Sequence, residues 1–122
     1  MQTTQIAVDL AKSVFEVAVS HEPGQVTDHR RLTRTGFRRF LESQPPSEIL
    51  MEACGTAHYW GRECHGLGHT VRLLPASDVW RYWDGNKTDR TDTHALLEAS
   101  RNARIDEVPV KSEEHQAIAA LH

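Results

Sequence analysis

Four acidic residues stand at positions where a sheet and a helix could bring their carboxylates together. Asp9 and Glu52 each follow a short apolar run directly. Asp89 and Asp92 lie three residues apart, so one face of a helix can present both side chains. Carboxylate oxygens without His or Cys ligands select Mg²⁺ or Mn²⁺ over softer metals. The four residues therefore predict a magnesium or manganese site.

The chemistry of such a site follows from its charge. Clustered carboxylates are unfavourable without a cation, because like charges at close range raise each other's pKa values. Two divalent ions about 3.5–4 Å apart can activate an attacking oxygen and stabilise a leaving oxygen in phosphodiester cleavage. Each acid taken alone has a simpler explanation, such as a turn cap, a surface charge or a complement to a helix dipole. Their shared placement at two strand ends and one helix start favours the metal site.

The elements that would position these acids follow from the spacing of apolar residues. Apolar and alternating runs predict five strands, over residues 6–9, 14–19, 26–32, 49–52 and 71–74, with a hairpin turn at Pro23-Gly24. Helical spacing predicts helices capped by Thr35, Thr56 and Ser77, a longer helix from Thr88 to about Ala103, and a last helical segment that starts at Ser112.

The order of these elements predicts an α/β fold in which Asp9 and Glu52 meet. A strand-helix-strand crossover makes its two strands parallel, and right-handed connections allow the fourth strand to lie beside the first. Both acids would then project from the carboxyl ends of the strands, where open α/β sheets bind ligands. A helix bearing Asp89 and Asp92 that packs across this edge would complete the cluster.

Composition limits the classes of protein to consider. The 122 residues fit one domain, and two cysteines are too few for a disulfide-rich secreted framework. No apolar run is long enough for a signal peptide or a membrane span, so we expect a cytoplasmic protein with no membrane contact. The net charge of -3 is unusual for an autonomous nucleic-acid binder, which normally carries a basic excess.

Basic residues are nevertheless concentrated in one segment. Five arginines and no acid lie between His29 and Leu41, namely Arg30, Arg31, Arg34, Arg38 and Arg39. They predict phosphate contacts with nucleic acid, and a solvated helix face explains them equally well. Lys87 offers the same two interpretations, a phosphate contact or a solvated loop lysine.

Cysteine and histidine residues suggest a second kind of metal site. Cys54, His58, Cys64 and His69 could form a mixed sulfur and nitrogen set for zinc. The spacing matches no standard zinc finger, and Cys64 falls on the apolar face of its helix. Buried thiols, with histidines that make structural hydrogen bonds or line the cleft, are the interpretation we favour.

Aromatic residues offer a possible stacking surface for nucleic-acid bases. Trp60, Trp80, Tyr82 and Trp83 are the candidates, although aromatics at such spacings are more often core residues. We assign Trp60 to the core and leave Trp80 open between the two roles.

The ordered motifs of this chain resemble those of one protein family over nearly its whole length. They are Ile6-Ala7-Val8-Asp9 with Lys12, Met51-Glu52-Ala53-Cys54-Gly55 with Ala57, His58 and Trp60, Gly68-His69, Asn86-Lys87-Thr88-Asp89 with Asp92, and Val108-Pro109-Val110-Lys111. This combination resembles the N-terminal domain of the DEDD transposases, insertion-sequence recombinases that act with a structured bridge RNA. The chain departs from the family's usual residues at Gly61, Cys64 and Trp80, where alanine, leucine and a basic residue are common.

The resemblance implies a ribonuclease H-like (RuvC-like) fold, with a mixed five-stranded sheet and helices on both faces. It implies that Asp9, Glu52, Asp89 and Asp92 are the catalytic, metal-holding DEDD set for DNA strand cleavage and transfer. It also implies DNA and a structured guide RNA as partners, a C-terminal domain that carries a nucleophilic serine, and a homo-oligomer for the full-length protein.

The domain organisation expected on this basis is a RuvC-like domain over residues 1–111, followed by the start of a linking helix over residues 112–122. Nothing in the sequence matches the serine-bearing domain, so we expect an incomplete enzyme. Two alternatives stay open, a catalytically silent RNA- or protein-binding module with the same fold, and a free-standing metal-dependent nuclease.

Overall fold

The five predicted strands form one mixed sheet in the computed structural model, which describes residues 3–11, 13–83 and 89–121, without the side chains of residues 89–91. The strands are β1 (Gln5–Asp9), β2 (Val14–Ser20), β3 (Asp28–Thr33), β4 (Glu48–Glu52) and β5 (Thr70–Leu74), in the order β3-β2-β1-β4-β5. β1, β2 and β3 are antiparallel neighbours, whereas β4 lies parallel to both β1 and β5. The fourth strand therefore lies beside the first, as the crossover predicts.

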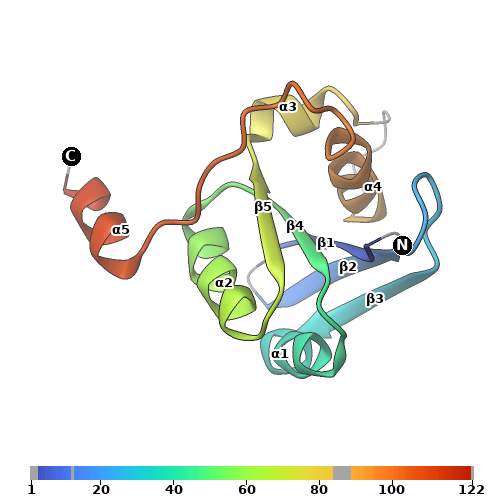
Figure 1. The fold of residues 1–122 in the computed structure, drawn as a ribbon, viewed down its shortest axis with the longest axis horizontal. Helices are drawn as coiled ribbons and strands as arrows, with labels where there is room; N and C mark the ends of the chain where they lie inside the picture. The colour runs from blue at the N-terminus through green and yellow to red at the C-terminus, as the bar shows by residue number, and fades with distance from the viewer. Residues whose placement is uncertain (1–2, 12, 84–88, 122) are drawn as a thin grey trace.

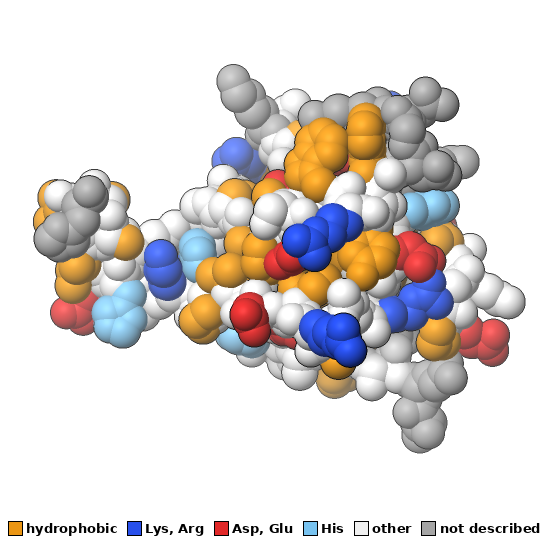
Figure 2. Space-filling view, turned by 90° about the horizontal axis from the view of Figure 1, so that it is seen from above, with side chains coloured by type: hydrophobic (Ala, Val, Ile, Leu, Met, Phe, Trp, Pro, Cys, Tyr) orange, Lys and Arg blue, Asp and Glu red, His pale blue; other side chains and the backbone are white. Residues whose placement is uncertain are grey.

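Helices cover both faces of this sheet (Figure 1). One face carries α1 (Arg34–Ser43) and α2 (Gly55–Gly66), and the other carries α3 (Ala76–Trp80) and α4 (Asp89–Ala99). The last helix, α5 (Glu113–Ala120), has no buried residue and projects from the body of the molecule (Figures 1 and 2), to which Gln116 joins it by hydrogen bonds with Gly55 and Arg62 of α2. The α/β, ribonuclease H-like architecture expected from the sequence is confirmed.

Alternation along the strands divides the apolar residues between two cores. Toward α1 and α2 point residues such as Val8, Phe15 and Met51, with Trp60 of α2 only 4% exposed among them. Toward α3 and α4 point Ala7 and Leu50. Successive side chains point to opposite faces, so Asp9 and Glu52 fall on the same side of the sheet as α4.

The chain between the two antiparallel hairpin strands turns at Pro23-Gly24, as predicted. Gly24 has a φ of 81°, a conformation that glycine adopts without steric cost. The third strand is an edge strand as expected, but it begins at Asp28 rather than Val26.

The predicted helix caps are wrong by two residues at three helices. α1 is capped by the Thr33 hydroxyl, which accepts a hydrogen bond from the Gly36 N–H, and not by Thr35. Cys54 and Pro75 occupy the cap positions of α2 and α3 in place of Thr56 and Ser77. At both of these helices the chain enters the first turn almost directly from a strand, so the backbone sets the start and no side-chain oxygen caps it. The last helical segment starts at Ser112 as predicted, and the Ser112 side chain caps α5.

The end of α4 also differs from expectation. α4 ends at Ala99 instead of about Ala103, because the backbone turns at Ser100 to Asn102. Leu67 follows α2 as its C-terminal cap residue and is 37% exposed.

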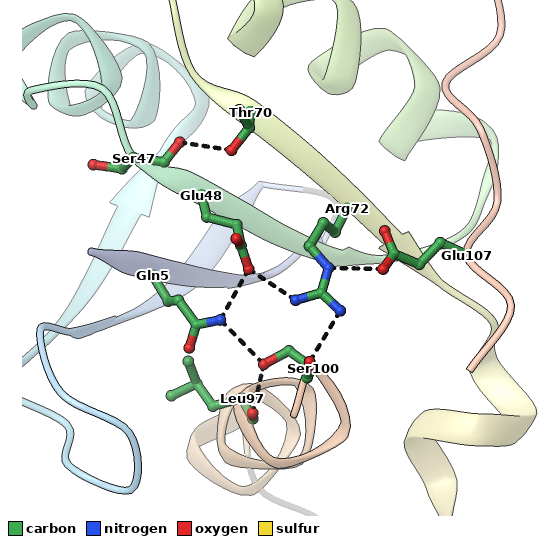
Figure 3. Close-up of polar contacts among 8 residues, drawn as sticks. All are labelled: Gln5, Ser47, Glu48, Thr70, Arg72, Leu97, Ser100 and Glu107. Carbon is green, nitrogen blue, oxygen red and sulfur yellow. Dashed lines mark hydrogen bonds and ion pairs between the residues drawn. The ribbon is translucent and has the colours of Figure 1, made fainter. Parts of the chain in front are cut away.

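A polar network holds the C-terminal end of α4 against the amino ends of β1 and β4 (Figure 3). Arg72 of β5 donates to Glu48 at 2.9 Å, to Glu107 at 2.8 Å and to the Ser100 carbonyl at 2.9 Å. Gln5 donates to the same Glu48 carboxylate at 2.9 Å and to the Ser100 hydroxyl at 3.3 Å. Burial alone would lower the pKa of Arg72, but the hydrogen bonds to Glu48 and Glu107 raise it overall.

In the described part of the chain, no helix combines the length and the apolar character needed to cross a membrane.

Candidate metal centre

Asp9 and Glu52 end two neighbouring parallel strands. Asp9 is the last residue of β1 and Glu52 the last of β4, and the register pairs Val8 with Met51 one position earlier. Buried apolar runs fix both strands in the middle of the sheet, so the backbone beneath the two carboxylates is rigid.

The third acid comes from the helix that crosses this edge. α4 packs on β1, β2 and β4 through Ala95, Leu96 and Ala99, which are at most 2% exposed. Asp92, one turn before Ala95 and Leu96, is partly buried. Asp89 is the first residue of α4, but its side chain lies outside the described residues, as does the whole of Lys87.

Three of the four predicted acids line one cavity of about 320 Å³. Its polar walls include Asp9, Glu52 and Asp92. The rest is largely apolar and aromatic, formed by Val8, Leu10, Cys54, Val79, Trp80, Trp83, Ala95 and Leu96. A larger cavity of about 570 Å³ shares Trp83 but is lined by none of these three acids.

The donor set fits a hard divalent cation, although the side chains are not gathered around one point. Among the described side chains, no three of the His, Cys, Asp or Glu type are close enough to form a metal-binding group. Mg²⁺ does not require a complete protein cage, because it retains several waters and is usually held by one or two carboxylates together with substrate phosphates. Three carboxylates around one cavity provide this kind of partial shell.

A further buried acid, Glu16, lies beside this site and was not singled out from the sequence. It sits directly opposite Asp9 in the β1–β2 register, so the two side chains share a face of the sheet. Glu16 is 6% exposed, and its carboxylate pairs with the Arg31 guanidinium at 2.8 Å. The His29 Nδ1 lies 3.5 Å from the same carboxylate. His29 reaches Thr93 of α4 at 3.4 Å. A charged residue between the apolar neighbours Phe15 and Val17 was a signal, but it needed the hairpin register to be interpreted.

The five predicted arginines do not form one surface. Arg30 and Arg31 are consecutive in β3 and therefore point to opposite faces of the sheet. Arg30 pairs with Asp28 at 2.7 Å, and Arg38 pairs with Glu63 at 2.8 Å. These contacts lower the pKa values of Asp28 and Glu63 and raise the pKa of Arg38.

The two remaining arginines of the segment are available for contacts with other molecules. Arg34 and Arg39 are exposed on α1, and neither has an ion pair among the residues that the structure describes. They are therefore the members of the segment best able to meet a phosphate.

Two members of the cysteine and histidine set, His69 and Cys64, are buried in structural positions. His69 is 3% exposed and uses both ring nitrogens, accepting from the Ser47 N–H at 3.0 Å and donating to the Leu41 carbonyl at 2.8 Å. Cys64 is buried, and burial raises the pKa of its thiol to about 12, which opposes the thiolate that zinc requires. The expectation of buried thiols holds for Cys64 and is wrong for Cys54, which is exposed at the start of α2. The expectation of hydrogen-bonded histidines agrees with these contacts.

The aromatic residues divide between core and cavity. Trp60 contacts Phe15 and Phe37 edge to face, with ring centroids 5.6 and 4.9 Å apart, which confirms its core assignment. Trp80 is 51% exposed, and its ring centroid lies 4.8 Å from that of Trp83 at the carboxylate cavity.

Comparison with known proteins bears on what this cavity does. Residues 6–122 match the model of the IS110-type DEDD family, whose description is transposase. The chain is 43% identical over 122 residues to a probable family 20 transposase of Pseudomonas aeruginosa, covering 100% of this chain and 36% of the relative.

Two further relatives agree in type. The chain is 33% identical over 119 residues to a transposase for insertion sequence element IS1328 of Yersinia enterocolitica, covering 98% of this chain and 36% of that protein. It is 35% identical over 116 residues to a transposase for insertion sequence element IS1111A of Coxiella burnetii, covering 95% and 32%. The chain thus spans about a third of the length of the curated relatives it matches.

Proposed function

Because the chain belongs to the IS110-type DEDD transposase family, we propose that it supplies the metal-binding carboxylates of a DNA transposase or recombinase. The observation that carries the proposal is that Asp9, Glu52 and Asp92 line one cavity beyond the ends of two parallel strands. Asp89 is proposed as the fourth member, because it precedes Asp92 by one turn of the same helix.

The proposed mechanism depends on the charge of the four acids and on the elements that position them. The four acids would hold Mg²⁺ or Mn²⁺, and a bound divalent ion would activate an attacking oxygen and stabilise a leaving oxygen of a phosphodiester. The sheet fixes Asp9 and Glu52, while α4 brings Asp92 toward them across the edge. Apolar walls around the carboxylates lower the local dielectric constant, which strengthens every charge interaction in the cavity.

In this proposal, the other steps of the reaction require the full-length transposase. Its partners would be DNA, a structured guide RNA, a serine-bearing C-terminal domain and further copies of the same protein. The 122-residue chain alone should therefore bind the cation without exchanging DNA strands.

Thermal unfolding with and without Mg²⁺ or Mn²⁺ tests the metal part of the proposal. A ligand that binds only the native state raises the melting temperature, by roughly 5–10 °C for a domain of this size at 10 to 100 times its Kd. We expect that shift in the wild-type protein. Asp9→Asn should remove most of it, and should raise the melting temperature of the metal-free protein by relieving carboxylate repulsion.

The matched control is Asp106→Asn, which removes one exposed carboxylate outside the set that lines the cavity. It should leave the metal-induced shift unchanged. Equal shifts in wild type and Asp9→Asn would mean that the ions act non-specifically, and no shift in wild type would favour the catalytically silent module. DNA cleavage by residues 1–122 alone would favour the free-standing nuclease.

A further inference from the structure

The mouth of the carboxylate cavity presents an exposed indole. α3 follows β5 directly, and its Val79 side chain is 5% exposed and packs into the core beneath α4. The next residue, Trp80, is turned outward and is 51% exposed. Since Val79 anchors this turn, the position of Trp80 is set by core packing.

A second indole supports the first. The Trp80 and Trp83 ring planes are inclined by 64°, with centroids 4.8 Å apart, an edge-to-face pair. Both residues line the same cavity as Asp9, Glu52 and Asp92. A rigid aromatic surface therefore adjoins the acids, where a bound substrate would have to pass.

The charge of the cavity restricts what this surface can bind. Carboxylates repel the phosphates of a nucleic-acid strand, so contacts that hold the strand beside them must rely on something other than phosphate charge. The π-face of a base provides such a contact, because stacking on an aromatic ring does not require a counter-charge.

The residue after Trp80 is a cation, Arg81, which lines the neighbouring 570 Å³ cavity and not the carboxylate cavity. The Arg81 side chain is 76% exposed, and its only ion pair among the described residues is with Asp78 at the long distance of 3.9 Å. Proteins bind single strands with exposed aromatic rings for the bases and exposed cations for the backbone, and here consecutive residues supply one of each.

We propose that Trp80 stacks on an unpaired DNA base next to the phosphodiester at the carboxylate cavity, with Arg81 contacting a phosphate of the same strand. The inference rests on the proposed function, which supplies the phosphodiester. A base inside a duplex has no free face to offer, so the strand at this point must be unpaired. Every base has a π-face, so the contact tolerates any sequence.

Binding of a fluorescein-labelled, twelve-nucleotide DNA single strand to the 122-residue protein tests the proposal. Anisotropy is measured in the presence of a metal chelator, so that no outcome depends on the metal. Trp80→Ala should weaken binding roughly 5- to 100-fold, the range expected for loss of one stacked base. Trp80→Phe should retain most of the affinity, because it keeps an aromatic face.

The matched control is Tyr59→Ala, which removes an aromatic side chain of similar exposure, 45%, on α2. It should leave the affinity unchanged, and all variants should unfold at temperatures close to wild type because both positions are exposed. A second arm uses a strand of equal length with abasic sites, which keeps the phosphates and removes the bases. Wild type should bind this strand as weakly as Trp80→Ala binds the normal one.

The proposal would be overturned if wild type and Trp80→Ala bound the normal strand equally. It would also be overturned if wild type bound the normal and abasic strands equally, or bound neither. Trp80-dependent binding confined to an RNA strand of the same sequence would overturn the assignment to DNA. A metal-induced melting shift together with any of these results would leave the proposed function standing. If the wild-type protein shows no metal-induced shift but binds DNA through Trp80, the stacking role of Trp80 stands and the proposed metal-binding function fails.

Discussion

At the scale of single residues, His58 links α2 to the chain that leaves the domain. Its Nδ1 accepts the Lys111 backbone N–H at 3.0 Å, and the side chain is 6% exposed. Burial lowers the pKa of His58, and the nearby charges of Lys111 and Arg62 lower it further. The neutral imidazole is therefore the form that the folded state favours.

This environment predicts a loss of stability in mild acid. Below the ordinary pKa of 6.5 the unfolded chain takes up a proton on His58 while the folded chain does not, so the free energy of unfolding falls as pH falls. The slope from one such group is at most about 1.4 kcal/mol per pH unit. Melting temperatures at about pH 7.5 and pH 5.5 measure it.

The control for the acid effect is His58→Asn, whose amide oxygen can accept the same N–H but does not titrate. The variant should lose less stability than wild type between the two pH values. Parallel losses in the two proteins would assign the acid sensitivity to other groups.

The positions of the candidate acids in the fold were easier to predict from the sequence than their surroundings. Asp9 and Glu52 could be placed because each ends an apolar run, and a run of that kind predicts a buried strand. The pairing of Glu16 with Arg31 could not be predicted, because it depends on the register of two strands on either side of a turn.

At the scale of elements, α2 and residues 108–111 approach each other closely at a glycine. A Cβ added to Gly61 would lie 2.9 and 3.1 Å from the two methyl groups of Val110. Val108 forms an antiparallel bridge with Leu73, so the segment is held in place just before this contact. Gly61 thus allows the chain to run directly over α2.

Gly61→Ala should consequently destabilise the protein, although alanine is the better helix former. Overpacking costs about 1–3 kcal/mol, whereas alanine gains about 1 kcal/mol over glycine inside a helix. We expect the free energy of unfolding in urea to fall by about 1 kcal/mol. Additional truncation by Val110→Ala should relieve the overlap.

The double-mutant cycle gives the decisive quantity. The double variant should be more stable than the sum of the two single effects predicts, because Val110→Ala removes the methyl groups that Gly61→Ala would meet. Additive effects would mean that residues 108–111 move away from α2 at little cost.

Helix boundaries show what local sequence could not determine. Thr35 and Thr56 are good capping residues, yet α1 and α2 begin earlier because they follow strands after almost no loop. The types and order of the elements come from periodicity over many residues, which tolerates such local errors.

At the scale of the whole molecule, positive and negative side chains are mixed on the surface. The chain carries a net charge of -3, and Figure 2 shows basic, acidic and hydrophobic side chains interspersed on one face. Three of the five arginines predicted to bind nucleic acid are in ion pairs with acids of the same chain. Contact with phosphates would have to come mainly from Arg34 and Arg39.

Replacing both Arg34 and Arg39 with alanine should therefore weaken duplex DNA binding and flatten its salt dependence. Loss of two phosphate contacts lowers the slope of log K against log salt concentration by roughly 2. The matched control, Arg101→Ala with Arg104→Ala, changes the net charge equally at exposed positions after α4. Equal slopes in both double variants would make the arginine segment a solubilising surface.

The hydrogen-bond network around Arg72 holds α4 at its C-terminal end. Its C-terminal end is fixed through Ser100, whereas Asp92 lies near the opposite end. For a helix of 11 residues, about 16 Å long, a tilt of about 10° about the C-terminal end moves the far end by roughly 3 Å. Such a tilt would change the gap between Asp92 and the two strand-end acids without breaking the hydrogen bonds at Ser100, and Ala95 and Leu96 would have to shift on the sheet with it.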